Sequence, residues 1–459
     1  MLSRFDKEKI TLIIIFAALT IIQLIVANQL RFVPTLDAGS LFFAAIDFAT
    51  TGSITNLYYF AMFGNQWAPL LFISGIFRIT RFFTQDFFMV YAGVLAVIVN
   101  MGLFAMYDLI KRQSSRRVAF IMLGVVLIYT PIYVFPTLIY TDVASMAMPI
   151  LALNLFYRIK DSACKKKRVV LAILLGVTLA VGTAIKITVL IIFIAMVMLA
   201  WIFNERAALY KALLIAALII VAVMGVSRIH YRHHISDELL ERWQTPWYQW
   251  IIMGLKEEGL EDNMWTGTNV GHFYNATFHM ETMEERKAFL REEFIRLTSD
   301  RNAVDWARLF VKKYIVLHYR GDFAPGATIA FTPEDTGFMA WYRDVRFTTP
   351  YIVYHRIIIY TITLLAYISV FFKRRDHVAA LALLGVYMFF IFLCEVRVRL
   401  LTNQFYIFFY LASISVNGII LKIQQLRSQK NEALVPPGIA PHDITPPDIT
   451  PSDVDPPDS

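Results

Sequence analysis

The side chains of this sequence that could do chemistry are charged groups beside hydrophobic runs: Asp37, Asp142, Lys186, Arg228, Arg397 and Arg399. A charge at such a boundary is costly unless it is paired or functional. A carboxylate there can act as a general base on a hydroxyl group within hydrogen-bond reach. Arginine and lysine are the usual ligands of phosphate. Together the cations indicate that the protein holds an anion at a membrane surface, most simply a lipid phosphate or pyrophosphate.

Each of these residues also has a simpler interpretation. Any one of the cations could reach from the membrane interface into water. Asp142 could cap the helix that follows it, and Asp37 precedes an amphipathic helix expected to begin near Ser40. Asp47, which lies within that helix, could equally be an interfacial side chain. These alternatives stay open from the sequence alone.

Two further groups of residues suggest metal or redox chemistry at first sight. The spacing of His230, His233 and His234 matches no standard zinc motif, which favours a polar segment at headgroup level. Cys164 and Cys394 are expected near opposite membrane faces, so we expect packing residues and no disulfide between them. Whether a metal ion is needed is left undetermined.

The composition is that of a protein with many membrane crossings. The chain has 459 residues, of which 58% are hydrophobic and 17% charged, and its mean hydropathy is +0.56. This excludes a soluble enzyme. The net charge is +8, but the Lys and Arg clusters lie mostly between hydrophobic runs, as orientation signals do, so no nucleic-acid partner is expected.

Hydropathy predicts an all-α polytopic membrane protein with about ten transmembrane helices. A bilayer crossing needs roughly 17–25 residues, and apolar runs near this length cover residues 10–30, 87–110, 117–140, 143–159, 169–184, 187–203, 210–228, 351–372, 377–394 and 400–421. Residues 169–203 are too long for one helix. Gly182 and Lys186 divide them into a predicted hairpin of two short spans.

The distribution of positive charge predicts the orientation. Basic clusters at 111–117, 165–168, 206–211, 373–375 and 422–430 should all be cytoplasmic. The basic N-terminal residues before the first run are typical of an uncleaved signal anchor. Both termini are therefore expected in the cytoplasm of a cell-membrane protein, and all six candidate residues outside. This holds only if residues 42–63 and 67–83 form outer juxtamembrane helices or, alternatively, a two-span hairpin.

The same topology predicts the domain organisation. A transmembrane catalytic module covers residues 1–228 and includes a first external loop, 31–86. A large external loop covers 229–350, with helical patterns at 283–297 and 304–318, the second of which could rest on the membrane. The last three spans cover 351–421. The Pro- and Asp-rich segment 422–459 is expected to be a disordered cytoplasmic tail.

The order of these features resembles the integral-membrane glycosyltransferases of fold class C, in particular the bacterial branch similar to protein mannosyltransferases and aminoarabinose transferases. The resemblance runs through residues 10–204 and returns at 377–421. In that family an external Asp follows the first span, as Asp37 does, and a juxtamembrane helix containing Tyr and Pro follows, as in residues 58–72. A basic turn and then a Thr-Asp pair come next, matched by residues 111–117 and 141–142.

The end of the chain carries a further part of the resemblance. The family often has Glu-x-Arg-x-Arg-Tyr before its final span, and residues 395–399 match this pattern, with Leu400 in place of the Tyr. Two departures bear on donor and acceptor. The family often has two adjacent carboxylates in the first loop, whereas Ala38 follows Asp37. The customary Lys-Pro-Pro is replaced by Trp-Ala-Pro at residues 67–69.

The resemblance implies a polyprenyl-phosphate-dependent glycosyltransferase, with a sugar donor in the outer leaflet and a lipid, polysaccharide or protein acceptor. It implies Asp37 as the general base, and Lys186, Arg228, Arg397 and Arg399 as ligands of the donor phosphate. Asp142 would orient one of the cations, or join Asp37 in holding a divalent ion. Single displacement would invert the anomeric centre.

Two other classes of protein remain as alternatives. A polymerase or ligase using undecaprenyl-diphosphate glycans shares the outer arginines and the large loop, but has no particular need for a carboxylate such as Asp37. A lipid or glycan transporter would have charges in mid-span and broken helices at matching positions of internal repeats. The sequence shows no such repeats, although it has one break, at Gly182 and Lys186.

Overall fold

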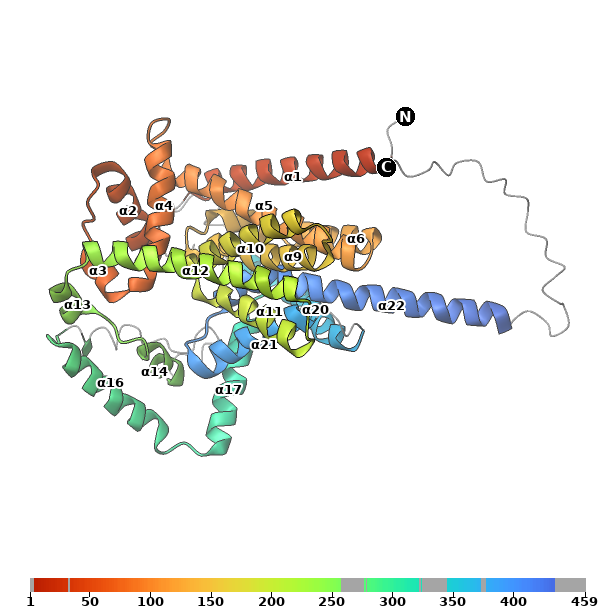
Figure 1. The fold of residues 1–459 in the computed structure, drawn as a ribbon. Coiled ribbons are helices and arrows are strands. Elements are labelled where there is room, and N and C mark those ends of the chain that lie inside the picture. Colours follow the sequence, from red (N-terminus) through yellow and green to blue (C-terminus); the bar gives the residue numbers. More distant parts are fainter. Residues whose placement is uncertain are drawn as a thin grey trace.

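The protein is a helical bundle in which the start of the first helix and the end of the last helix lie at the same end. The computed structural model describes residues 4–31, 34–256, 276–277, 279–321, 323, 345–372 and 377–433, and these contain no β-strand. This confirms the all-α class. The first turn of α1 (Arg4–Gln29) and the last turns of α22 (Phe405–Ala433) lie at one end of the bundle, which we call the terminal end (Figure 1). The helices formed by residues 36–80 lie at the opposite end, which we call the distal end (Figure 1).

The described residues contain six helices that are long and apolar enough to cross a membrane. These are Lys7–Gln29 in α1, Phe87–Gln113 (α5), Lys165–Ile185 (α10), Ala207–His234 (α12), Thr349–Phe371 and Val398–Gln429. The helices Ile187–Ile202 and His377–Leu393 are apolar but shorter. Helix α9 (Met148–Asp161) has 14 residues, which is roughly 21 Å and less than a bilayer core. The predicted number of ten crossings is therefore not established.

One predicted span is broken. Instead of one straight helix over 117–140, the chain forms α6 (Arg116–Ile128) and then, after a bend of 70°, α7 (Pro131–Val134) and the 3₁₀ turn η2 (Phe135–Thr137). Pro131 explains the break, because proline lacks the backbone donor that a continuing helix needs and disfavours helical geometry in the residue before it. Pro136 lies in η2, directly after the single turn of α7. If this bent pair is one span, the count of crossing helices rises to seven.

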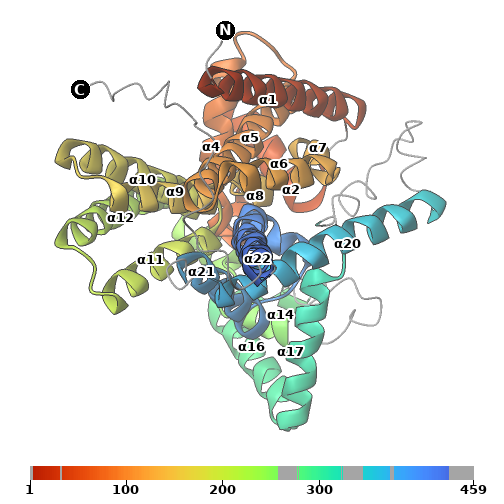
Figure 2. The ribbon, with the colours of Figure 1, turned by 90° about the vertical axis from the view of Figure 1, so that its right-hand side faces the viewer.

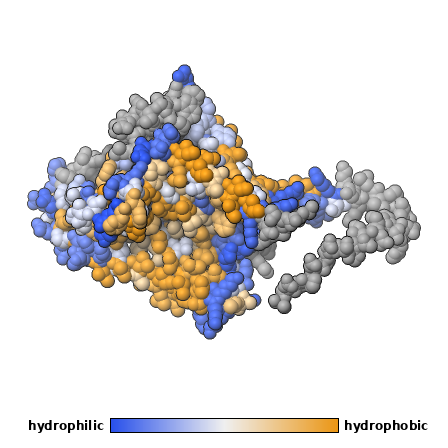
Figure 3. All heavy atoms as spheres, turned by 90° about the horizontal axis from the view of Figure 1, so that it is seen from above, coloured by the Kyte–Doolittle hydropathy of each residue, from blue (hydrophilic) through white to orange (hydrophobic). Residues whose placement is uncertain are grey.

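The surface of the bundle is apolar over a broad area. Figure 3 shows hydrophobic side chains gathered over the middle of one face, with hydrophilic ones toward the distal end. Large apolar side chains such as Ile13, Val221 and Ile357 are exposed on the long helices. Exposed apolar area of this extent needs a lipid environment. The chain is a multi-pass membrane protein.

Ion pairs join the predicted basic clusters at the terminal end. Lys111 and Arg116 lie 2.6 and 3.1 Å from the carboxylate of Glu8, in the second turn of α1. Lys160 pairs with Glu205, so the ends of α9 and α11 (Leu190–Ile202) lie together. Arg112 lies 3.8 Å from Asp161, and Asp161 lines a small cavity together with Arg168 and Arg206. The clusters 111–117, 165–168 and 206–211 thus share one end of the bundle, as one cytoplasmic face requires. The cluster 373–375 lies outside the described residues, and the side of the membrane stays a prediction.

The segment predicted to be the first external loop forms three helices and a turn: α2 (Leu36–Thr51), α3 (Leu57–Met62), the 3₁₀ turn η1 (Gly64–Gln66) and α4 (Trp67–Thr80). The first predicted helix, over 42–63, is in fact two, because the chain turns at Gly52, whose φ of 78° lies in the left-handed region. Helices α2 and α4 pack together, and α4 runs across the direction of α1 (Figure 1). Neither is among the crossing helices of the described chain.

The large loop contributes four described helices: α13 (Asp237–Trp243), α14 (Gln249–Leu255), α16 (Met283–Thr298) and α17 (Ala303–His318). The predicted helices at 283–297 and 304–318 are confirmed, and each begins with a capping box. Ile252 and Met253 of α14 pack on Leu290 of α16. Residues 257–275 and 324–344 of this loop lie outside the described part.

The last helices complete the bundle. They are α20 (Val345–Ile368), η4 (Ser369–Phe371), α21 (His377–Met388), the π-helical segment η5 (Phe389–Leu393), the 3₁₀ segment η6 (Val398–Gln404) and α22. Figure 2 looks along α22, with α20 and α21 on either side of it. Helix α22 continues to Ala433, so residues 422–433 are helical and not part of a disordered tail. The tail prediction for 434–459 lies outside the described residues.

Candidate functional site

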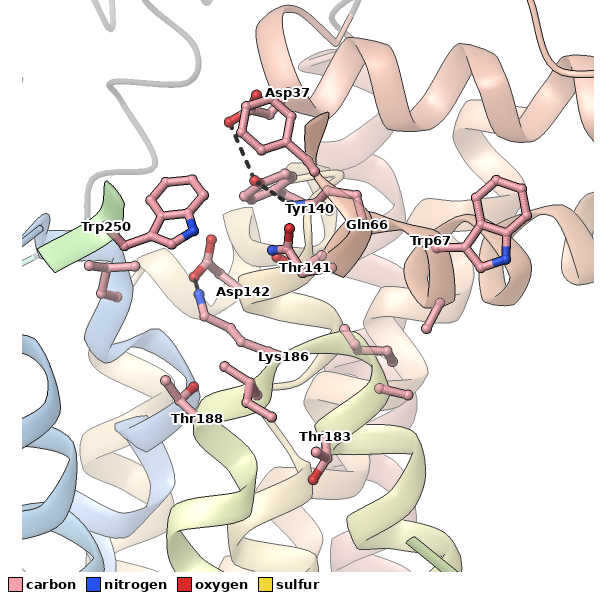
Figure 4. A pocket seen from close by; sticks show the side chains of 18 of the residues that line it. Asp37, Gln66, Trp67, Tyr140, Thr141, Asp142, Thr183, Lys186, Thr188 and Trp250 are labelled. Carbon is pink, nitrogen blue, oxygen red and sulfur yellow. Dashed lines mark hydrogen bonds and ion pairs between the residues drawn. The ribbon is translucent and has the colours of Figure 1, made fainter. Parts of the chain in front are cut away.

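A cavity of about 560 Å³ at the distal side of the bundle brings the predicted residues together. Its wall comes from α2, α3, η1, α8 (Thr141–Ala144), the ends of α10 and α12, α14, and the segment between η5 and η6. All six predicted site residues line it: Asp37, Asp142, Lys186, Arg228, Arg397 and Arg399. The cavity is shown from close by in Figure 4. The structure thus places together residues that are far apart in the sequence.

Asp37 lies in the first turn of α2. The helix begins at Leu36 and not near Ser40, and its N-cap residue is Thr35, so Asp37 is not the cap. The chain enters through a tight turn: Leu36 has a φ of +53°, and a Cβ on Gly39 would lie only 2.6 Å from the carbonyl oxygen of Pro34. A carboxylate in the first helical turn is stabilised by the helix dipole. The turn therefore fixes Asp37 at the cavity.

Two tyrosines hold the Asp37 carboxylate. Tyr59 donates a hydrogen bond to one oxygen at 3.3 Å. Tyr140 donates a longer one to the other oxygen at 3.5 Å, and Figure 4 shows this bond as a dashed line. Gln66 donates in turn to the Tyr140 hydroxyl at 3.2 Å. Burial raises the pKa of Tyr140 to about 12, and the charge of Asp37 adds to this rise. Tyr140 therefore remains protonated at neutral pH and can keep donating to Asp37.

Asp142 is a buried carboxylate with two cationic partners. It lies in the four-residue helix α8, whose N-cap is Tyr140, so it does not cap the next span. One oxygen pairs with Lys186 and the other lies 3.3 Å from the Arg399 guanidinium. Lys186 follows the last residue of α10 with extended backbone, which is the break predicted from the sequence. Asp142 therefore positions two of the four predicted phosphate ligands.

The other two cations differ in their surroundings. Arg397 lies 3.5 Å from Glu395, a residue of the same segment that also lines the cavity. Arg228 is exposed and stacks on the Tyr231 ring at 5.2 Å. It forms no ion pair with any carboxylate of the described residues. Arg228 is thus the predicted phosphate ligand with the least compensated charge.

The sequence did not single out several uncharged residues of the site. Tyr59, Gln66 and Tyr140 surround Asp37, and Trp250 of α14 lines the cavity from the large loop. Uncharged polar and aromatic side chains are common throughout this chain, so composition and charge give no signal for them. Glu395 belongs to the Glu-x-Arg-x-Arg pattern at residues 395–399 but was not assigned to the site. Its spacing of two residues from Arg397 could have indicated that it lies beside the cations.

Other charged residues of the first loop have structural partners. Arg78 and Arg81 donate to the carbonyl oxygens of Phe48 and Ala49, which α2 leaves unpaired at its end. Asp47 accepts a hydrogen bond from Thr55 at 2.6 Å and does not line the cavity. These three residues hold the first loop together.

The histidines also pack and do not form a cluster of ligands. His230 and His234 stack with ring centroids 4.3 Å apart, and His230 accepts a hydrogen bond from Trp67. Within the described ranges, no group of three or more His, Cys, Asp or Glu side chains is placed to hold a metal ion. Both Asp142 oxygens face cations. The described residues therefore do not fit the divalent-ion site considered for Asp37 and Asp142.

The fold and the site define a multi-pass helical membrane protein with a cation-rich cavity and a half-buried carboxylate. No family model matches the sequence, and no curated protein matches it. Among solved structures it is similar to ArnT from Cupriavidus metallidurans bound to undecaprenyl phosphate, with 12% identity, a TM-score of 0.39, and coverage of 89% of this chain and 77% of that one. The apo ArnT structure gives 12% identity, a TM-score of 0.39, and coverage of 88% and 77%. ArnT is an aminoarabinose transferase, the branch named above.

Proposed function

We propose that this protein transfers a sugar from a polyprenyl-phosphate-linked donor to a lipid, polysaccharide or protein acceptor at the outer face of the cell membrane. The observation that carries the proposal is the convergence of Asp37 with Lys186, Arg228, Arg397 and Arg399 on one cavity. The orientation with both termini in the cytoplasm, and the ten crossings, belong to the same proposal. A cavity of about 560 Å³ lies within the range usual for small-molecule sites.

The proposed reaction is a single displacement. Asp37 takes the proton of an acceptor hydroxyl, and the acceptor oxygen attacks the anomeric carbon of the sugar. The bond from that carbon to the phosphate oxygen breaks, and its electron pair stays with the lipid phosphate. Cations held in place before the reaction stabilise this growing negative charge. The displacement inverts the anomeric centre.

The ion pairs suggest how the cations divide this work. Lys186 and Arg399 are held by Asp142, so they keep one geometry through the reaction. Arg228 is exposed at the cavity, so it is the cation that can turn toward an arriving phosphate. Arg397 lines the same cavity and lies 3.5 Å from the carboxylate of Glu395. All four would bind the phosphate, and Asp142 would act through Lys186 and Arg399.

The first test replaces the proposed base. Purified Asp37→Asn protein is given undecaprenyl phosphate carrying one of a panel of hexoses or aminoarabinose, with membrane extract as the source of acceptors. We expect release of undecaprenyl phosphate to slow by roughly 10²–10⁴-fold, with affinity for undecaprenyl phosphate unchanged. Asp47→Asn is the matched control, because Asp47 lies on the same helix away from the cavity. Activity of Asp37→Asn within a few-fold of wild type would disprove the base assignment.

The alternative polymerase or ligase is separated by the donor. Such an enzyme uses glycans on undecaprenyl diphosphate, whereas the proposed transferase uses the monophosphate. Turnover by the wild-type protein with the diphosphate donor alone would favour the polymerase or ligase. Turnover with the monophosphate donor that is lost in Asp37→Asn would favour the transferase.

A further inference from the structure

The large external loop supplies one wall of the cavity. Helix α14 places Trp250 in its lining, and the ring of Trp250 lies 6.0 Å from that of Phe63, which follows α3 in the first loop. In Figure 4 the Trp250 indole lies level with the space between Asp37 and Asp142. Trp250 is half-buried, whereas Trp247, three residues earlier, is 74% exposed. The loop therefore directs one of these two tryptophans toward the site.

Close backbone packing holds α14 in this place. A Cβ on Gly254 would lie 2.4 Å from the carbonyl oxygen of Cys394, so the helix touches the segment that leads to Arg397 and Arg399. At the end of the helix, Arg301 donates a hydrogen bond to the carbonyl oxygen of Leu255 at 2.6 Å. These contacts fix the position of Trp250 relative to the segment that carries Arg397 and Arg399.

The position of Trp250 matches the place of the transferred sugar. In a single displacement the anomeric carbon must lie between the phosphate, near Lys186 and Arg399, and the base, Asp37. Trp250 faces this region of the cavity. An aromatic face binds an apolar surface, and a pyranose ring presents such a surface through its C–H groups. The other rings near Asp37, Tyr59 and Tyr140, are engaged with its carboxylate.

Resting on the function proposed above, we propose that Trp250, backed by Phe63, binds the ring of the sugar carried by the donor. Trp250 is then a specificity residue supplied by the external loop, and the residues around Asp142 bind the phosphate. The two contributions are separable, because undecaprenyl phosphate offers the phosphate without the sugar.

The test measures competition against radiolabelled undecaprenyl phosphate by undecaprenyl phosphate itself and by its hexose and aminoarabinose conjugates. The wild-type protein should bind at least one conjugate more tightly than undecaprenyl phosphate. In Trp250→Ala this gain should fall about tenfold, as truncation of a central tryptophan typically costs, with affinity for undecaprenyl phosphate unchanged. Trp250→Phe should keep most of the gain. Trp247→Ala is the matched control and should behave as wild type.

The outcomes distinguish this inference from the proposed function. An unchanged gain in Trp250→Ala, an equal loss for conjugates and undecaprenyl phosphate, or no conjugate preferred by the wild type would each overturn the role of Trp250. Wild-type turnover lost in Asp37→Asn would still support the transferase in all three cases. Absence of turnover with every donor would overturn the transferase itself, and with it the role of Trp250.

Discussion

The arrangement around Asp142 shows how a charged residue can be buried beside a membrane. Its carboxylate is 7% exposed and Lys186 is 13% exposed, and Arg399 provides the second partner. Buried charges of this kind are tolerated because they are paired, and removal of one partner leaves an uncompensated charge in a poorly solvated place. The sequence predicted these three residues at one face, and the resemblance implied that Asp142 orients one cation. It did not predict that Lys186 and Arg399 are both its partners, because hydropathy and charge bias carry no information on contacts.

We expect Asp142→Ala to destabilise the protein by about 3 kcal/mol, the usual cost of breaking a buried ion pair. Thermal unfolding of the purified protein in detergent should show a lower apparent Tm. The control is the double variant Asp142→Ala/Lys186→Met, which removes both charges and should lose much less than the sum of the single variants. Additive losses would show that Asp142 and Lys186 are not coupled.

At the scale of the helix, the start of α2 determines where Asp37 lies. The sequence predicted a helix from about Ser40, whereas it begins at Leu36. The strained φ at Leu36 and the contact of Gly39 with Pro34 could not be predicted from hydropathy. A bulky residue with a positive φ is uncommon, and such residues often mark a functional constraint.

We expect Gly39→Ala to lower the turnover number by roughly tenfold or more, because the new Cβ must push the start of α2 away from Pro34 and a shift of about 1 Å can cost 10²-fold. The rate of undecaprenyl phosphate release would be measured as for Asp37→Asn. Gly75→Ala on α4 is the control, since a Cβ there meets no atom within 4 Å. Equal rates for the two variants would remove the argument for a tight turn.

The bundle helices were easier to predict than the turns between them. Apolar helices occur in all ten predicted runs, and the break at Lys186 lies where the sequence placed it. The bend after α6 was missed, although Pro131 was a visible signal. The wall formed by α14 was missed for another reason: its seven residues, although mostly apolar, are too few to show a helical period within a loop of about 120 residues.

For the whole molecule, the two native cysteines offer a direct measurement of orientation. Cys164 is exposed at the start of α10, and hydrogen bonds from the backbone amides of Lys167 and Lys166 lower the pKa of its thiol. Burial raises the pKa of the Cys394 thiol to about 12. Since the thiolate is the reactive form, near neutral pH only Cys164 should react readily.

We expect a membrane-impermeant maleimide to label Cys164 only after the cells are permeabilised. In a Cys164→Ser background, Ser53→Cys, exposed after the end of α2 at the distal end, should be labelled in intact cells. Mass spectrometry of the modified peptides identifies each site. Labelling of both positions from the same side would disprove the predicted topology.

The pairing of Lys186 and Arg399 with Asp142 also affects how an anion dissociates from the cavity. These cations already have an internal counter-ion, so an arriving phosphate shares their hydrogen bonds instead of neutralising a bare positive site. The contribution of these two cations to the affinity should then respond weakly to ionic strength. In the proposed reaction the departing product is itself an anionic lipid. A cavity with its own counter-ion would release that lipid readily, and product inhibition would be mild.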